Sequence, residues 1–250
     1  MNCLLEVCCS DPGSVAAAKS GGADRIELCT SLETGGLTPS AALIDYAVRL
    51  MPGRVNVLIR PRGGDFLYSR EELDVILSDI HDAVARGASG IVCGALTAGG
   101  DIDTDALSEM IAAAGDVPFT LHRAFDVCRD PELALRQCID AGCARILTSG
   151  LAPTAVEGIP QLARLNTIAD GKIILIAAAG VGPDNALRIV EETGVKELHA
   201  SCKTLTGSKM RFRKESVNMG APGRDEYLRP TTDPDTVSRM TQLLHPNTQP

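Results

Sequence analysis

The sequence has few aromatic residues and no long apolar run. Its 250 residues include no Trp, 4 Phe and 3 Tyr, so a core must be built from aliphatic side chains. No apolar stretch approaches the roughly 20 residues that a membrane-spanning helix needs. The first nine residues also lack the positively charged start of a secretory signal. We therefore expect no membrane segment and no signal peptide.

The sequence also has no excess of positive charge and no paired metal-binding motif. The 32 acidic residues exceed the 24 Lys and Arg residues, and the resulting net charge of −8 argues against a nucleic-acid-binding surface. The 9 cysteines include no pair at the spacing typical of zinc sites. An odd number of cysteines without such spacing indicates reduced thiols in the cytoplasm and not a disulfide framework.

The sequence does contain a regular alternation of β-branched apolar runs and amphipathic helical stretches. This alternation is typical of a parallel α/β fold, and 250 residues is the usual size of one (β/α)8 TIM barrel. We predict a single domain over residues 1–250 with a flexible C-terminal tail. The expected strands are Cys3–Cys9, Arg25–Cys29, Val55–Arg60, Gly90–Gly94, Pro118–Arg123, Arg145–Ser149, Ile173–Ala177 and Glu197–Ser201.

An internal repeat favours closure of these strands into a barrel. Residues 22–29, 87–94, 142–149 and 194–201 align without gaps on a shared first glycine. Each segment falls at an even-numbered strand, so the repeat spans two strand–helix units and occurs four times around an eight-stranded barrel. The alternative is an open doubly wound sheet, which the absence of a GxGxxG turn disfavours.

The repeat also predicts which side chains point into the barrel. Side chains alternate along a strand, so the uniformly apolar fifth position should face the helices and the sixth and eighth positions should face inward. On the first strand Glu6 shares a face with Cys8, so two neighbouring strands carry Glu-x-Cys toward the mouth. The fifth, sixth and eighth positions are Ile26, Ile91, Ile146, Leu198; Glu27, Val92, Leu147, His199; and Cys29, Gly94, Ser149, Ser201.

Local signals place helix starts and one long loop. Ser69 with Glu72 forms a capping box, and each of three cappers before a proline predicts a helix start: Thr38-Pro39, Asp130-Pro131 and Asp233-Pro234. After the eighth strand, residues 202–230 form a long basic segment before the final helix. We expect this loop to lie over the barrel mouth, because long loops in compact domains are usually functional.

Two loops supply candidate anion-binding and catalytic residues. In RPRGGDFLYS, residues 60–69, Arg60 and Arg62 offer guanidinium forks that suit carboxylate or phosphate groups. In HRAFD, residues 122–126, His122 could act as acid or base, Arg123 as an anion clamp and Asp126 as an orienting group.

Together with Glu27 as a proton carrier, and Ser149 and Gly180 as further anion-binding residues, these loops would form an enzyme site for a small anionic or phosphorylated substrate. The structural alternative is a buried ion pair, for instance Arg60 with Glu27. His122 could likewise only bond Glu27 or a backbone carbonyl.

Cys8 and Cys29 allow a metal-binding hypothesis. Adjacent strands lie about 4.8 Å apart, so two thiols at equal height could bracket one soft ion, and thiolates select Cu(I). A buried Cys is also commonly a small hydrophobic residue. Both interpretations stay open on spacing alone.

Six segments together resemble the copper homeostasis protein CutC family. They read LEVC at 5–8, GGADRIELC at 21–29, GGLTPS at 35–40, IRPRGGDFLYS at 59–69, FTLHRAFD at 119–126 and LTSG at 147–150. The resemblance runs from about residue 3 to residue 220. It implies a TIM barrel, a cytoplasmic location and a role in copper handling, with Cys8 and Cys29 as the Cu(I) ligands.

The sequence departs from the family pattern after the seventh strand. Relatives carry Gly-Gly-Gly where this chain has Ala178-Ala179-Gly180. In barrels this loop often holds phosphate with backbone amides, and two methyl groups there would hinder that approach. The expected partners are therefore a copper ion, a small anionic ligand and, since barrels commonly form homo-oligomers, a second copy in a homodimer.

Overall fold

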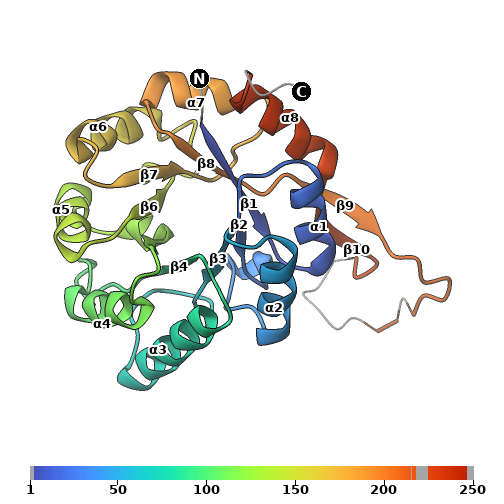
Figure 1. Cartoon of the computed structure of the whole chain (residues 1–250), viewed down its shortest axis with the longest axis horizontal. Coiled ribbons are helices and arrows are strands. Elements are labelled where there is room, and N and C mark those ends of the chain that lie inside the picture. Colours follow the sequence, from blue (N-terminus) through green and yellow to red (C-terminus); the bar gives the residue numbers. More distant parts are fainter. Residues whose placement is uncertain (1–2, 215, 218–224, 247–250) are drawn as a thin grey trace.

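Eight parallel strands close into a barrel in the computed structural model, which describes residues 3–214, 216–217 and 225–246 (Figure 1). The strands follow one another around the barrel in sequence order, and β8 pairs with β1. The predicted barrel is confirmed, and each strand end lies within two residues of its expected place. The strands are β1 Leu4–Cys9, β2 Arg25–Leu28, β3 Val55–Leu58, β4 Gly90–Cys93, β5 Phe119–Leu121, β6 Arg145–Thr148, β7 Ile174–Ala177 and β8 Glu197–Ala200.

Helices surround the barrel on its outside (Figure 1). The apolar fifth positions of the repeat are fully buried between strands and helices, as predicted. No helix among the described residues is long and apolar enough to cross a membrane. The helices are α1 Pro12–Ser20, α2 Ala41–Leu50, α3 Arg70–Ala85, α4 Thr104–Ala114, α5 Pro131–Ala141, α6 Ile159–Ala169, α7 Ala186–Thr193 and α8 Pro234–Leu244, with the short 3-10 helices η1 Leu32–Thr34 and η2 Arg123–Val127.

Three of the four expected helix starts are confirmed. Ser69 and Glu72 form the capping box of α3, and the aspartates before α5 and α8 accept backbone N–H groups just ahead of a proline. The Thr38-Pro39 prediction is wrong, because α2 begins at Ala41 with Ser40 as its N-cap. The Thr38 hydroxyl instead accepts the amide N–H of Arg60 and ties this loop to the end of β3.

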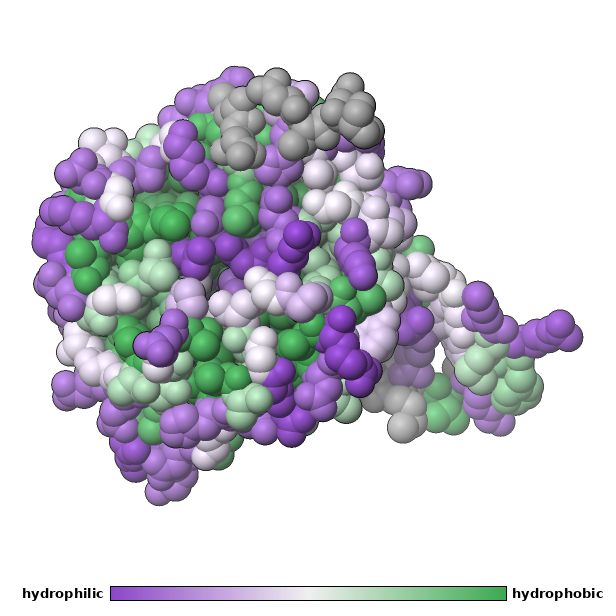
Figure 2. Space-filling view, in the orientation of Figure 1, coloured by the Kyte–Doolittle hydropathy of each residue, from purple (hydrophilic) through white to green (hydrophobic). Residues whose placement is uncertain are grey.

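The segment after β8 does not lie over the mouth. It forms a two-stranded antiparallel hairpin of β9 Lys203–Gly207 and β10 Leu228–Thr232, which contacts α1 and stands out from the side of the barrel (Figures 1 and 2). The expectation of a basic lid is therefore wrong for the described part of this segment. Residues 215 and 218–224, and the expected tail at 247–250, lie outside the described residues.

The lower interior of the barrel is a network of charges and not an apolar core. The Arg25 guanidinium donates from Nε to Glu6 and from Nη2 to Glu197, each at 2.6 Å. Arg145 Nε lies 3.1 Å from the same Glu197 oxygen, and Asn56 Nδ2 donates to Glu6 at 3.0 Å. Because each of these groups has a partner, the network tolerates its burial and connects β1, β2, β3, β6 and β8.

The loop after β7 holds one residue in an unfavourable backbone conformation. Ala179 has a φ of +76°, a region that glycine adopts freely and alanine does not. Its carbonyl accepts the amide N–H of Ala155 at 2.9 Å, which helps to hold this conformation. The loop therefore keeps a backbone shape that suits the family glycine although a methyl group is present.

We predict that Ala179→Gly raises the free energy of unfolding by about 1 kcal/mol, because it relieves the left-handed alanine. Urea denaturation measures the change. The matched control is Ala16→Gly on the exposed side of α1, which should lower stability by about 1 kcal/mol. An Ala179→Gly variant that is no more stable than the parent would contradict this interpretation.

We also predict that Arg25→Met destabilises the fold by about 3 to 5 kcal/mol, because it removes the arginine partner of the buried Glu6 and one of the two arginines at Glu197. Arg145→Met serves as the control, since Arg145 pairs with the same Glu197 but its side chain is 19% exposed against 10% for Arg25. That control should cost about 1 to 2 kcal/mol. If urea denaturation shows that both variants lose the same small amount of unfolding free energy, the network contributes little to stability.

Candidate functional site

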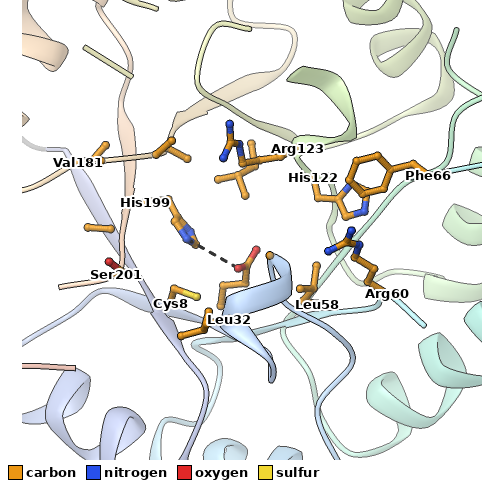
Figure 3. Close-up of a pocket in the computed structure, with 17 residues that line it drawn as sticks. Cys8, Leu32, Leu58, Arg60, Phe66, His122, Arg123, Val181, His199 and Ser201 are labelled. Atoms are coloured by element: carbon orange, nitrogen blue, oxygen red, sulfur yellow. Dashed lines mark ion pairs between the residues drawn. The ribbon is translucent and has the colours of Figure 1, made fainter. Parts of the chain in front are cut away.

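A cavity of about 220 Å³ opens at the carboxyl ends of the strands, which is the predicted barrel mouth. Its floor and sides include the apolar side chains of Leu32, Leu58, Leu147 and Val181. Polar residues gather on two walls that face each other across the cavity (Figure 3). The thiol wall consists of Cys8, His199 and Ser201, and the arginine wall of Arg60, Phe66 and His122.

The two predicted metal-binding cysteines meet at the thiol wall. The Cys8 and Cys29 sulfurs lie 3.6 Å apart, much farther than the roughly 2.05 Å of a disulfide bond, so both are free thiols. Cys8 lines the cavity, and Cys29 is fully buried behind it among Leu58 and Val92. The hydrogen bond to Cys29 and burial raise the pKa of Cys8 well above its usual value. A metal must therefore displace a proton to bind there.

A histidine and a carboxylate adjoin Cys8. His199 Nδ1 lies 2.8 Å from Glu6 Oε1, which directs Nε2 toward Glu27, whose Oε2 is 3.9 Å away (dashed line in Figure 3). One donor atom each from Cys8, Glu27 and His199 fall within 4.8 Å of one another. The contact with the Glu6 carboxylate fixes the orientation of the His199 ring, as an outer carboxylate does for histidines that bind metals.

The charges of this group depend on burial and on close partners. Burial alone would raise the pKa of Glu6, but the His199 hydrogen bond and the Arg25 charge outweigh it and lower that pKa to about 2. Burial raises the pKa of Glu27 to about 7. Burial also disfavours a charged His199, yet Glu27, Cys8 and Glu6 together raise its pKa well above the usual value. Glu6 is thus ionised, and its contact with His199 Nδ1 positions that residue of the thiol wall.

Arg60 reaches the cavity but does not pair with Glu27. Its side chain is only 6% exposed, and its guanidinium lies 5.0 Å above the centre of the Phe66 ring. Three of its N–H groups donate to the carbonyl oxygens of Thr34, Gly36 and Gly64.

Arg62 lies outside the cavity, although the sequence suggested that it would bind an anion beside Arg60. Its Nε donates to Glu72 at 2.5 Å, Nη2 lies 3.2 Å from Asp65, and the guanidinium stacks on the Tyr68 ring. The strand has ended two residues before Arg60, so the alternation no longer governs where Arg62 points. Its donors hold the loop before α3 in shape.

His122 lines the cavity on the arginine wall and makes no bond to Glu27. Its Nδ1 accepts the amide N–H of Ala124 at 3.3 Å, so the neutral ring carries its hydrogen on Nε2. Burial and the Arg60 charge lower the pKa of His122 to about 3. The ring is therefore neutral, and it is His199 and not His122 that adjoins Glu27.

Arg123 lines the rim of the cavity, while its two neighbours build the loop behind it. Arg123 Nε donates to Asp126 at 2.6 Å, and Nη2 donates to Ser149 Oγ at 3.1 Å. Asp126 also accepts from Thr148 Oγ1 and from the Ser149 amide. Neither Asp126 nor Ser149 reaches the cavity, so both position Arg123 instead of contacting a ligand. Gly180 does line the cavity, in the loop after β7.

Some residues at and below the mouth have no role predicted from the sequence. These residues are Arg25, Asn56, Phe66 and His199. The repeat places His199 facing inward but assigns it no function. A useful signal exists for His199: closing the barrel puts β8 beside β1, so an inward His199 must lie next to Glu6.

Comparison with known proteins identifies the family. The CutC family model matches residues 3–204. The family protein CutC of Bacteroides thetaiotaomicron is 47% identical over 96% of this chain and 97% of its own length. The Vibrio campbellii protein of the same name is 46% identical over 98% of this chain and 100% of its own.

A crystal structure of the copper homeostasis protein CutC from Streptococcus agalactiae has a TM-score of 0.76 at 33% identity, and covers 80% of this chain and 98% of its own. These matches extend across the barrel and its mouth. The chain belongs to the CutC family.

Proposed function

We propose that this protein binds Cu(I) at the barrel mouth through Cys8 and Cys29 and serves in copper handling. The observation that carries the proposal is the 3.6 Å approach of two buried free thiols at the wall of a cavity. The similar protein from Streptococcus agalactiae is named a copper homeostasis protein, which supports the proposal.

The donor set fits a soft ion. Two thiols and the imidazole of His199 are ligands that Cu(I) prefers, while Glu27 is a hard donor. Cys29 is not part of the group in which Cys8, Glu27 and His199 lie within 4.8 Å of one another. Four donors therefore do not converge on one tetrahedral centre, which disfavours structural zinc. Cys8 and Cys29 would hold the ion, with His199 as an adjacent third donor.

The thiols also favour a cytoplasmic location as part of this proposal. All 9 cysteines are free and buried. Free thiols persist where glutathione and thioredoxin keep them reduced. Thiols that must stay available to Cu(I) suit that environment.

We predict that the double variant Cys8→Ser, Cys29→Ser loses the Cu(I) equivalent bound by the parent protein, or binds it at least 100-fold more weakly, because hydroxyls do not replace thiolates for a soft ion. Anaerobic competition against a coloured Cu(I) chelator measures both stoichiometry and affinity. Zinc is titrated in parallel as the competing metal.

Cys128→Ser is the matched control, since Cys128 is also a buried free thiol but does not line the cavity. Circular dichroism confirms that each variant is folded. Unchanged copper stoichiometry and affinity in the double variant, or tighter binding of zinc than of Cu(I) by the parent, would contradict the proposal.

A further inference from the structure

The arginine wall contains a buried cation without a counter-charge. Arg60 is only 6% exposed, and its three hydrogen bonds of normal geometry go to backbone carbonyl oxygens, while its other side-chain neighbour for hydrogen bonding is the neutral Tyr68 hydroxyl. Within the described residues Arg60 takes part in no ion pair. A buried charge ordinarily has an ionic partner because its desolvation is costly. The missing partner is therefore expected in the cavity that Arg60 lines.

The free donors of Arg60 have a suitable arrangement for a carboxylate. A guanidinium carries five N–H groups. Backbone carbonyls take two from Nη1 and one from Nη2, and Nε is buried without a hydrogen bond of normal geometry, although the Tyr68 hydroxyl interacts with the Arg60 side chain. Two N–H groups on neighbouring nitrogens thus remain for one bidentate acceptor.

His122 adds a third donor on the same wall. Its Nδ1 is occupied as an acceptor, so Nε2 carries the hydrogen, and Nε2 is buried with no partner among the described residues. An unsatisfied buried donor costs about 1 to 3 kcal/mol. The Phe66 ring packs at 4.7 Å against the His122 ring and lies under the Arg60 guanidinium, so it holds both groups in place.

The opposite wall limits the charge of the ligand. Ser201 lies across the cavity from Arg60 (Figure 3), and Glu27 lines the same cavity. An ionised Glu27 would repel a second anionic group while accepting a hydroxyl. Arg123, the other arginine at the cavity, already pairs with Asp126. One uncompensated cation, apolar side walls and about 220 Å³ suit a small molecule with a single negative charge.

We propose that the arginine wall binds a small organic monocarboxylate, with its carboxylate on Arg60 and the His122 Nε2–H and its hydroxyl groups toward Glu27 and Ser201. The carboxylate replaces the missing counter-charge of Arg60 and satisfies the buried donor of His122. The site is separate from Cys8 and Cys29 and does not require a metal.

The test titrates metal-free protein, kept reduced and with chelator, with glycolate, D-glycerate, D-gluconate and D-glucuronate by calorimetry. D-glucose is the neutral counterpart, and glycerol 3-phosphate and inorganic phosphate are the phosphorylated and inorganic ones. We expect at least one carboxylate to bind and D-glucose not to bind. Arg60→Gln should weaken that carboxylate at least tenfold, and His122→Phe about fivefold to tenfold.

Arg70→Gln is the matched control, because Arg70 is exposed just after the same loop and does not line the cavity, and it should change the affinity less than twofold. If Arg60→Gln does not fold, Arg60→Lys keeps the charge without the fork and should still weaken binding. The proposal is overturned if no carboxylate binds, if only the phosphorylated compound or phosphate binds, or if the arginine and histidine variants bind like the parent.

Discussion

The carboxylate of Glu6 is the contact on which the inside of this barrel depends. It accepts from Arg25 at 2.6 Å and Asn56 at 3.0 Å, and it meets His199 Nδ1 at 2.8 Å. The first two contacts belong to the charge network of the lower barrel, and the third sets the orientation of the histidine beside Cys8. The buried Glu6 carboxylate thus connects the charge network of the lower barrel to the thiol wall of the cavity. A neutral residue at this position would leave both Arg25 and His199 without a common partner.

The mouth above Glu6 combines two kinds of chemistry within about 220 Å³. The thiol wall offers soft donors that are protonated until a metal displaces the proton, while the arginine wall offers fixed N–H donors and one unpaired charge. These walls come from opposite sides of the barrel, since β1 and β8 carry the first and the ends of β3 and β5 carry the second. A copper role alone does not explain why Arg60 is buried without an acid, and a small-molecule role alone does not explain two opposed thiols. The closed barrel allows both because each wall is built by different strands.

The period-two alternation and the repeat were enough to predict the strands, the barrel and the inward side chains, including Glu27 and His199. The approach of Cys8 and Cys29 was predicted from their neighbouring strands, but the expected equal height was wrong. Cys8 is in register with Glu27, so Cys29 lies two residues farther along, just beyond the end of β2. Residues beyond strand ends were not predictable in this way. Arg60 and Arg62 are two positions apart, yet one enters the cavity and the other bonds Glu72, because loop hydrogen bonds decide their directions. Asp126 and Ser149 likewise resemble site residues in the sequence, but the Asp126 carboxylate accepts the Ser149 amide N–H and both residues lie outside the cavity. The hairpin of β9 and β10 was not predicted, because the composition of this segment does not indicate where it lies relative to the barrel.

The opposed thiols of Cys8 and Cys29 are central to the proposed copper role. X-ray absorption at the copper edge of the Cu(I)-loaded parent protein tests that role most directly, because sulfur and nitrogen or oxygen scatterers are distinguishable in the first coordination shell. We expect two sulfur ligands per copper ion. A first shell of nitrogen and oxygen alone would contradict copper binding by these thiols.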